Sequence, residues 1–363
     1  MARSNRIAQI AELEKLRGGR HVISYVTSTR TNFEMQIADD VLPLIHEHLD
    51  AAGEKTEKGV DLFIHSNGGS GTVPWRLVSL IREYTKNFAV LVPHRAFSAA
   101  TLIALGADEI VMHRMGCLGP IDPSVANQFN PPNLQNPALP IPISVEDVTA
   151  YFRLVKEEVG INHQDELVQA LVALTEKIHP LALGNVQRSH NQSRLMARKL
   201  LRNHMEAKQE HEIDTIIENL KSNLFFHGHP INRKEAKEDL NLKVESAPRE
   251  LEAAMWRLYS EYNSTLKLDE PFSALHELDV ASIRLQQASG TQPPSPGAGG
   301  AATPAQAVKV RLDKMPGIYV ESTLRADVFL TDIVLQRATI NTAAGPQDAI
   351  RQEVIWQRWE QEE

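Results

Sequence analysis

Residues 61–123 decide the fold, and they divide into three successive pieces: DLFIHSNGGSGTVPWRLVSLIREY (61–84), FAVLVPHRAFSAATLIALGADEIVMH (88–113) and RMGCLGPIDP (114–123). Short apolar runs, which are typical of buried strands, alternate in them with two segments of helical character. Repeated strand–helix units build a sheet whose strands are mostly parallel. The sequence therefore predicts an α/β protein.

Two features of this stretch follow predicted strands. The run Leu62-Phe63-Ile64 leads to Asn67-Gly68-Gly69, where glycine permits a positive φ and a close approach of the backbone to a ligand. The next apolar run, 88–92, leads to Ser98, which opens a helix of small and apolar residues. Because both strands belong to one parallel sheet, we expect the glycine turn and the serine at the same sheet edge. There they can act as an oxyanion hole beside a nucleophile.

Each of these features also has an ordinary structural explanation. A serine at the start of a helix most often caps the first N–H groups of that helix. Gly-Gly turns close many loops that have no catalytic role. Only the arrangement of Ser98 beside the glycine turn favours a catalytic site over these alternatives.

The motifs SNGG (66–69), AFSAATLIALGADEIVMH (96–113) and GCLGPIDP (116–123) occur in an order that resembles the Clp-fold serine peptidases. These include signal peptide peptidase A, the NfeD-type membrane-associated peptidases, the Clp protease proteolytic subunit and especially the serine dehydrogenase proteinases. The resemblance extends over roughly residues 20–244. It implies a ClpP/crotonase-like fold of repeated strand–helix units, to which the chain adds a helical extension and a small β-containing C-terminal tail.

The resemblance also implies roles for individual residues. Ser98 matches the family nucleophile, and Gly68 or Gly69, together with the amide of Ala99, matches the oxyanion hole. The substrate that these roles imply is a peptide or protein. The family also forms rings or paired rings, so the resemblance implies a homo-oligomer.

The chain departs from the Clp subunit at the general base. The family histidine falls here on Asp122, and a carboxylate is too weak a base for a serine proton near neutral pH. The signal peptide peptidase and NfeD-type branches use a lysine instead, on a helix that follows an irregular loop. Here the loop at 131–144 leads into a segment with Tyr151-Phe152 followed by Lys156, which resembles the NfeD-type pattern. The resemblance therefore implies that Lys156 is the base of a Ser-Lys dyad.

A solvated lysine is the competing interpretation of Lys156, since Glu157-Glu158 follows it directly. A base role needs partial burial, which lowers the pKa of a lysine from its ordinary value of about 10.4. Val155 and Val159 could supply part of that burial. Other candidates for the base are Lys177, His179, His190 and, in reserve, His94.

Composition disfavours several classes of function. The 363 residues carry a formal net charge of -8, which argues against nucleic acid or anionic lipid as the main partner. Cys117 is the single cysteine, so an internal disulfide is impossible and a reducing compartment, the cytoplasm, is expected. No window approaches about 18 uninterrupted apolar residues, so neither a signal peptide nor a transmembrane anchor is expected. We therefore expect a soluble enzyme.

No metal or cofactor is expected from the sequence. His46 and His48 are two residues apart on a predicted helix, so they do not share a face. His227 and His229 are suitably spaced on an extended segment, but no third ligand stands beside them.

The chain divides into four predicted segments. Residues 1–20 form an N-terminal helix, and residues 21–288 form the peptidase domain with its C-terminal helices. Residues 289–306 are rich in Pro, Gly and Ala and are expected to form a flexible linker. Residues 307–363 form a small element with β-type alternation and a final helix that carries Ile355, Trp356 and Trp359.

Three functions are consistent with this sequence. The first is a serine peptidase with Ser98 as its nucleophile. The second is a catalytically inactive oligomeric scaffold with the same fold, because the histidine base is missing. The third is an acyl-CoA hydratase or isomerase of the crotonase type, which ranks last because SNGGSGT (66–72) contains no acidic residue.

Overall fold

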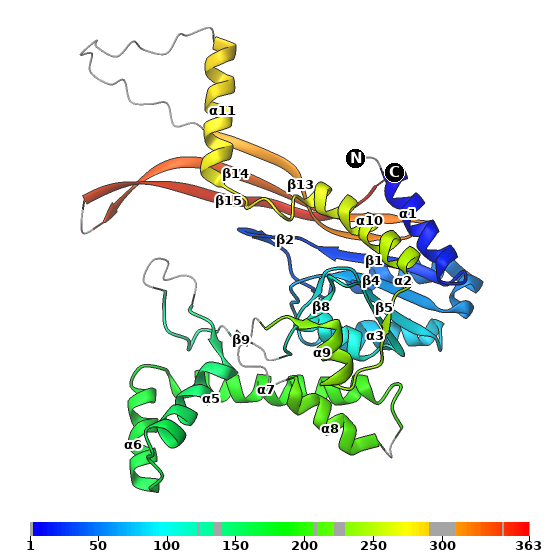
Figure 1. Ribbon diagram of the computed structural model, residues 1–363. Coiled ribbons are helices and arrows are strands. Elements are labelled where there is room, and N and C mark those ends of the chain that lie inside the picture. Colours follow the sequence, from blue (N-terminus) through cyan, green and yellow to red (C-terminus); the bar gives the residue numbers. More distant parts are fainter. Residues whose placement is uncertain are drawn as a thin grey trace.

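The computed structural model describes residues 3–121, 124–125, 127–133, 140–206, 209–220, 229–289, 309–342 and 345–362. Its centre is an eight-stranded sheet in the order β12-β7-β5-β4-β1-β13-β14-β15 (Figure 1). Neighbouring strands from β12 to β1 are parallel, and those from β1 to β15 are antiparallel. The parallel strands are β1 (His21–Thr27), β4 (Val60–His65), β5 (Phe88–Val92), β7 (Glu109–Met112) and β12 (Val244–Ser246). The α/β prediction is confirmed.

Helices cover both faces of the parallel strands. Leu62 and Ile64 of β4 point into one apolar core, while Phe63 points into a second core on the opposite face. Burial on both faces explains why these strands are continuous apolar runs rather than alternating ones. The first core is covered by α2 (Val41–Ala52), α3 (Val73–Tyr84), α4 (Ala99–Leu105), α7 (Pro180–Leu201) and α8 (Glu210–Asn219). The second is covered by α1 (Arg3–Leu16) and α10 (Arg249–Leu266).

Short elements connect these layers. A three-stranded sheet is formed by β6 (Arg95–Ala96), β8 (Cys117–Leu118) and β11 (Ile231–Asn232). Two small pairs are formed by β2 (Thr29–Arg30) with β3 (Phe33–Glu34) and by β9 (Ser124–Val125) with β10 (Ile143–Ser144). The remaining short helices are η1 (Gly53–Lys58) and α9 (Arg233–Glu238).

The helical extension projects from the body of the protein (Figure 1). It consists of α5 (Val145–Arg153), the π-helical turn η2 (Leu154–Glu158) and α6 (Gln164–Thr175). A small apolar cluster, which includes Ile143, Ala182 and Val186, joins this extension to α7. In contrast, α6 has no buried residue.

The C-terminal residues add three antiparallel strands to the main sheet. They are β13 (Lys309–Glu321), β14 (Ala326–Thr342) and β15 (Gly345–Gln361), and α11 (Ala274–Ser289) packs beside them. The predicted final helix is wrong, because Trp359 pairs across the strands with Phe329 inside β15. Cross-strand packing has overridden a spacing that also suits a helix. The predicted linker falls, apart from Ser289, outside the described residues.

Buried charges join these C-terminal strands to the rest of the chain. Glu321 of β13 accepts hydrogen bonds from Arg6 Nε at 2.6 Å and from Tyr262 Oη at 2.8 Å, and all three side chains are buried. His48 of α2 lies 3.1 Å from a carboxylate oxygen of Asp327. Removal of one partner of such a buried pair destabilises a protein by several kcal/mol, because the other charge stays buried without a counter-ion. In the part of the chain that the structure describes, no helix is long and apolar enough to span a bilayer.

Candidate active site

Ser98 is held in an unusual backbone conformation at the start of α4. Its φ of 52° and ψ of -112° lie outside the regions that a serine ordinarily adopts. Such a conformation costs on the order of 1–3 kcal/mol and persists only where surrounding structure enforces it. The Ser98 side chain makes no capping hydrogen bond to α4, so the helix-cap explanation of this serine does not apply. Its hydroxyl is half-buried and is left available to a ligand.

The loop that carries Ser98 is fixed by hydrogen bonds from both sides. Ser66 N–H donates to Arg95 O at 3.1 Å, and Phe97 N–H donates to Ser66 O at 3.0 Å. The buried Thr101 hydroxyl contacts Ala96 O at 2.7 Å and Gly119 O at 2.9 Å. These bonds lock the segment before Ser98 against the end of β4.

Gly68 lies directly against Ser98. Its φ is 103°, and a Cβ atom at this position would stand 2.8 Å from Ser98 Cβ and 3.1 Å from the amide nitrogen of Ala99. Real Cβ contacts are longer than this, so only glycine fits here. The glycine turn and the serine that the sequence placed at one sheet edge are therefore in contact.

The main-chain N–H groups around Ser98 differ in whether they already donate a hydrogen bond. Gly68 N–H donates to Ser66 Oγ at 3.0 Å, so this donor is occupied. Ile37 holds the next residue in place, because Ile37 N–H donates to Gly68 O and Ser70 N–H donates to Ile37 O, both at 2.8 Å. The amides of Gly69 and Ala99 have no acceptor among the described residues. These two amides are therefore the candidates for the oxyanion hole that the sequence predicts.

Lys156 is not in contact with Ser98 in the single chain. It lies on η2, where Val155 is buried, but its own side chain is exposed and Val159 is 61% exposed. No hydrogen bond or ion pair of Lys156 occurs within the described ranges. The structure therefore leaves the Lys156 side chain exposed to solvent.

Among the described residues, no hydrogen bond joins Ser98 to any of the other candidate bases. His179 caps α7, because its Nδ1 accepts from Leu181 N–H at 3.1 Å, and its ring stacks on Phe129. Lys177 is exposed. His190 is half-buried on α7, and Asp122 lies outside the described residues.

A cluster of aromatic rings that sequence reasoning missed lies at the ends of β4 and β5. The rings of His65 and His94 stack with centroids 5.6 Å apart and planes 8° apart, and His94 Nδ1 lies 3.0 Å from Tyr259 Oη. Burial lowers the pKa of His65 well below its ordinary value, and neighbouring His94 and Arg95 lower it further. Burial likewise lowers the pKa of His94. His65 directly precedes the turn at 66–69, and His94 lies four residues before Ser98. This closeness in sequence was the signal that could have drawn attention to the two histidines.

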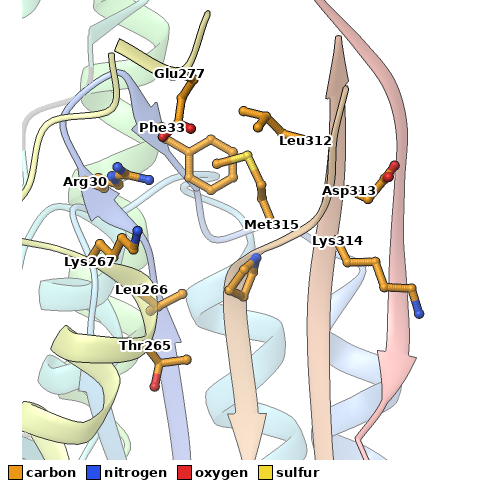
Figure 2. A pocket seen from close by; sticks show the side chains of 11 residues that line it. Arg30, Phe33, Thr265, Leu266, Lys267, Glu277, Leu312, Asp313, Lys314 and Met315 are labelled. Carbon is orange, nitrogen blue, oxygen red and sulfur yellow. The ribbon is translucent and has the colours of Figure 1, made fainter. Parts of the chain in front are cut away.

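A cavity of about 250 Å³ lies elsewhere, between the β2–β3 pair, α10, α11 and β13 (Figure 2). Arg30 and Lys267 line one side, and Leu312 and Met315 of β13 line the other. The buried Arg30 donates from Nε to Glu270 O at 2.7 Å, and burial lowers its pKa. It pairs with neither Asp39 nor Asp40, which bind Arg76 and Trp359 respectively. None of the lining residues belongs to the Ser98 site.

No metal site accompanies Ser98. Within the ranges that the structure describes, no group of three or more His, Cys, Asp or Glu side chains could hold a metal ion. His229, one of the histidines considered above, contacts Glu235 at 2.8 Å, and His227 lies outside those ranges.

Comparison with known proteins assigns the family. Residues 46–266, more than half of the 363, match the family of ClpP-like SDH-type serine proteinases. The chain belongs to this family. The resemblance that the motifs around Gly68 and Ser98 carry is thereby confirmed, together with the ClpP-like fold.

Relatives of this chain include two uncharacterised proteins of Methanocaldococcus jannaschii. MJ0137 is 28% identical over 205 residues, which cover 56% of this chain and 60% of that protein. MJ1495 is 38% identical over 66 residues, which cover 18% of this chain and 23% of that protein. The chain thus spans less than two thirds of the length of either relative. Among solved structures, a mutant of the 1510-N membrane-bound stomatin-specific protease aligns at 14% identity with a TM-score of 0.35, over 58% of this chain and 74% of that one.

Proposed function

We propose that this SDH-type proteinase is a peptidase that hydrolyses peptide bonds with Ser98 as its nucleophile. The observation that supports the proposal is the close approach of Gly68 to Ser98 and to the amide nitrogen of Ala99, together with the strained backbone and uncapped side chain of Ser98. A hydroxyl next to preorganised N–H groups is the arrangement that acyl transfer requires. Family membership supports the same reaction class.

The reaction would proceed in two stages. Ser98 Oγ adds to the peptide carbonyl as a base removes its proton, and the negative charge on the carbonyl oxygen is held by the amides of Gly69 and Ala99. Collapse of this tetrahedral species breaks the C–N bond, the base gives its proton to the leaving nitrogen so that the amine departs, and an ester remains on Ser98. Water then attacks the ester carbonyl, and the acid is released as Oγ regains its proton.

We infer that Lys156 supplies the base. Its place on a π-helical turn supports this, since such turns occur frequently at functional sites. In the single chain its amine is exposed, so the role requires that bound substrate or a second copy of the chain brings it near Ser98 and excludes water. The proposed enzyme therefore acts on peptides as a cytoplasmic homo-oligomer with a Ser-Lys dyad.

Hydrolysis of a quenched fluorescent peptide library tests both residues. Ser98→Ala should lower the rate by at least ~10³-fold, because it removes the proposed nucleophile. Lys156→Met should have a comparable effect, while Lys177→Met, an exposed lysine outside the proposed dyad, serves as a matched control and should retain activity. Full activity of Lys156→Met together with loss in Ser98→Ala would reject the lysine and keep the nucleophile.

An inactive scaffold is the second candidate, favoured by the fact that, among the described residues, no hydrogen bond joins Ser98 to a base and Lys156 is exposed. This candidate predicts that the folded, wild-type protein hydrolyses no member of the library. It also predicts that the Ser98→Ala variant assembles and binds partners as the wild type does. Hydrolysis that depends on Ser98 would eliminate it.

A further inference from the structure

The outer strand β15 has a free pairing edge. It is hydrogen-bonded to β14 on one side, and in the described part of the chain no strand lies on its other side. Residues 351–357 are all exposed, including Val354 at 50%, Ile355 at 48% and Trp356 at 38%. Figure 1 shows β14 and β15 extending past the body of the protein as a long ribbon. An edge with a row of unpaired N–H and C=O groups is a template for another strand.

A β-bulge gives this edge an unusual charge pattern. Asp332 of β14 pairs with Trp356, but the next residue, Ile333, pairs with Val354, so Ile355 is an extra residue in β15. Side chains alternate in a regular strand, and one extra residue shifts the alternation by one. Residues that lie opposite even-numbered positions of β14 therefore share one face. These are Arg351, Glu353, Trp356, Arg358 and Glu360.

The bulge thus brings two Arg-x-Glu pairs onto the same face of the strand. Without it, the seven-residue separation of Arg351 from Arg358 would place the pairs on opposite faces. Arg351 already pairs with Glu353 within the strand, and Arg358 with Glu360. Along the strand the four charges are basic, acidic, basic and acidic. When a second copy of the strand lies antiparallel to the first, each basic residue can therefore face an acidic one.

We propose that β15 pairs with β15 of a second copy of this chain, antiparallel, around a two-fold axis between Ile355 and Trp356. In that register Arg351 lies opposite the second copy's Glu360, and Glu353 lies opposite its Arg358. The same symmetry places Val354 opposite Gln357, and because of the bulge the two residues of each opposed pair lie on the same face of the sheet. Cross-strand pairs of opposite charge are favourable, and like charges directly opposite are not. A two-fold interface requires a surface of this self-complementary kind.

The apolar residues at the centre of the edge agree with this register. Val354, Ile355 and Trp356 lie next to the proposed axis, so the second copy would cover the most exposed apolar part of β15. Charges and bulges also occur on edges that must stay unpaired. A purely protective edge does not need its charges in self-complementary order, and that order distinguishes the two explanations. The inference does not depend on the proposed peptidase activity, because the interface is defined by β15 alone.

Two charge variants of the full chain test the proposal by sedimentation velocity. Arg351→Glu with Arg358→Glu makes the edge entirely acidic, and Glu353→Arg with Glu360→Arg makes it entirely basic. Each variant alone would oppose like charges at four places, so its dissociation constant should rise by at least about 30-fold. An equimolar mixture restores opposite charges at all four places and should form a heterodimer. The control, Lys234→Glu with Arg257→Glu, changes the net charge as the acidic variant does, at exposed ion pairs on α9 and α10, and should behave as the wild type.

The outcomes separate clearly. Halving of the wild-type mass in each variant and its recovery in the mixture would support the interface. A monomeric wild type at 50 µM protein, the concentration to be used, would overturn it. So would variants that keep the wild-type mass, or variants that dissociate but do not recombine although circular dichroism shows both to be folded.

Discussion

At the scale of single residues, the site depends on the absence of a side chain at Gly68. A Cβ atom there would collide with Ser98 and with Phe97 O, and the φ of 103° disfavours any other residue. Gly68→Ala should therefore displace Ser98 and lower the rate of peptide hydrolysis by about 10²-fold or more, the size of an oxyanion-hole defect. Gly71→Ala is the matched control, since nothing lies within 4 Å of its added Cβ. Equal rates in the two variants would contradict this geometry.

His65 makes a second prediction at this scale. Its pKa in the folded protein is well below its ordinary value because it is buried, while an unfolded histidine titrates near about 6.5. Below about pH 6.5, His65 is therefore protonated in the unfolded chain but not in the folded protein. The free energy of unfolding accordingly falls as the pH decreases. Urea unfolding between pH 7.5 and 5.5 should show this loss. His65→Phe should reduce the slope by up to about 1.4 kcal/mol per pH unit, and an unchanged slope would contradict the assignment.

At the scale of elements, the sequence predicted what local patterns determine. The strands and helices of residues 61–112 follow from apolar runs and glycine turns, and so does the meeting of Gly68 with Ser98. The strand β15 was missed, because the spacing of Trp356 and Trp359 also suits a helix, and pairing with β14 decides between the two. The His94–Tyr259 contact was missed because 165 residues separate the two. The sequence also did not show that Gly68 N–H donates to the Ser66 hydroxyl, because no sequence pattern reveals a single side-chain hydrogen bond of this kind.

Within α4, Thr101 is the residue that holds Ser98 in place. Its buried hydroxyl contacts Ala96 O and Gly119 O, and it accepts from Gly119 N–H at 3.1 Å. Thr101→Val keeps the shape but leaves these groups unpaired, so it should destabilise the protein by about 1–3 kcal/mol in urea unfolding. Thr215→Val, at an exposed position, should cost less than about 0.5 kcal/mol. A smaller loss of stability in Thr101→Val than in Thr215→Val would show that the hydrogen bonds of the Thr101 hydroxyl do not stabilise the fold.

At the scale of the whole molecule, the three C-terminal strands share the sheet and the buried charges of the body. Arg6→Met leaves Glu321 buried without its main counter-ion, which should cost about 3–5 kcal/mol in urea unfolding at pH 7. Arg6→Met with Glu321→Met removes both charges and should regain a large part of that loss. A single variant that costs less than about 1 kcal/mol would mean that the pair does not hold these parts together.

Covalent labelling of the wild-type protein with a fluorophosphonate, followed by peptide mapping, tests the central claim most directly. The reagent phosphonylates serine only where a hydroxyl is activated beside oxyanion donors. We expect one label per chain, on the peptide that contains Ser98, and none in the folded Ser98→Ala variant. Labelling of a different residue, or labelling that survives Ser98→Ala, would contradict the assignment of Ser98 as the nucleophile.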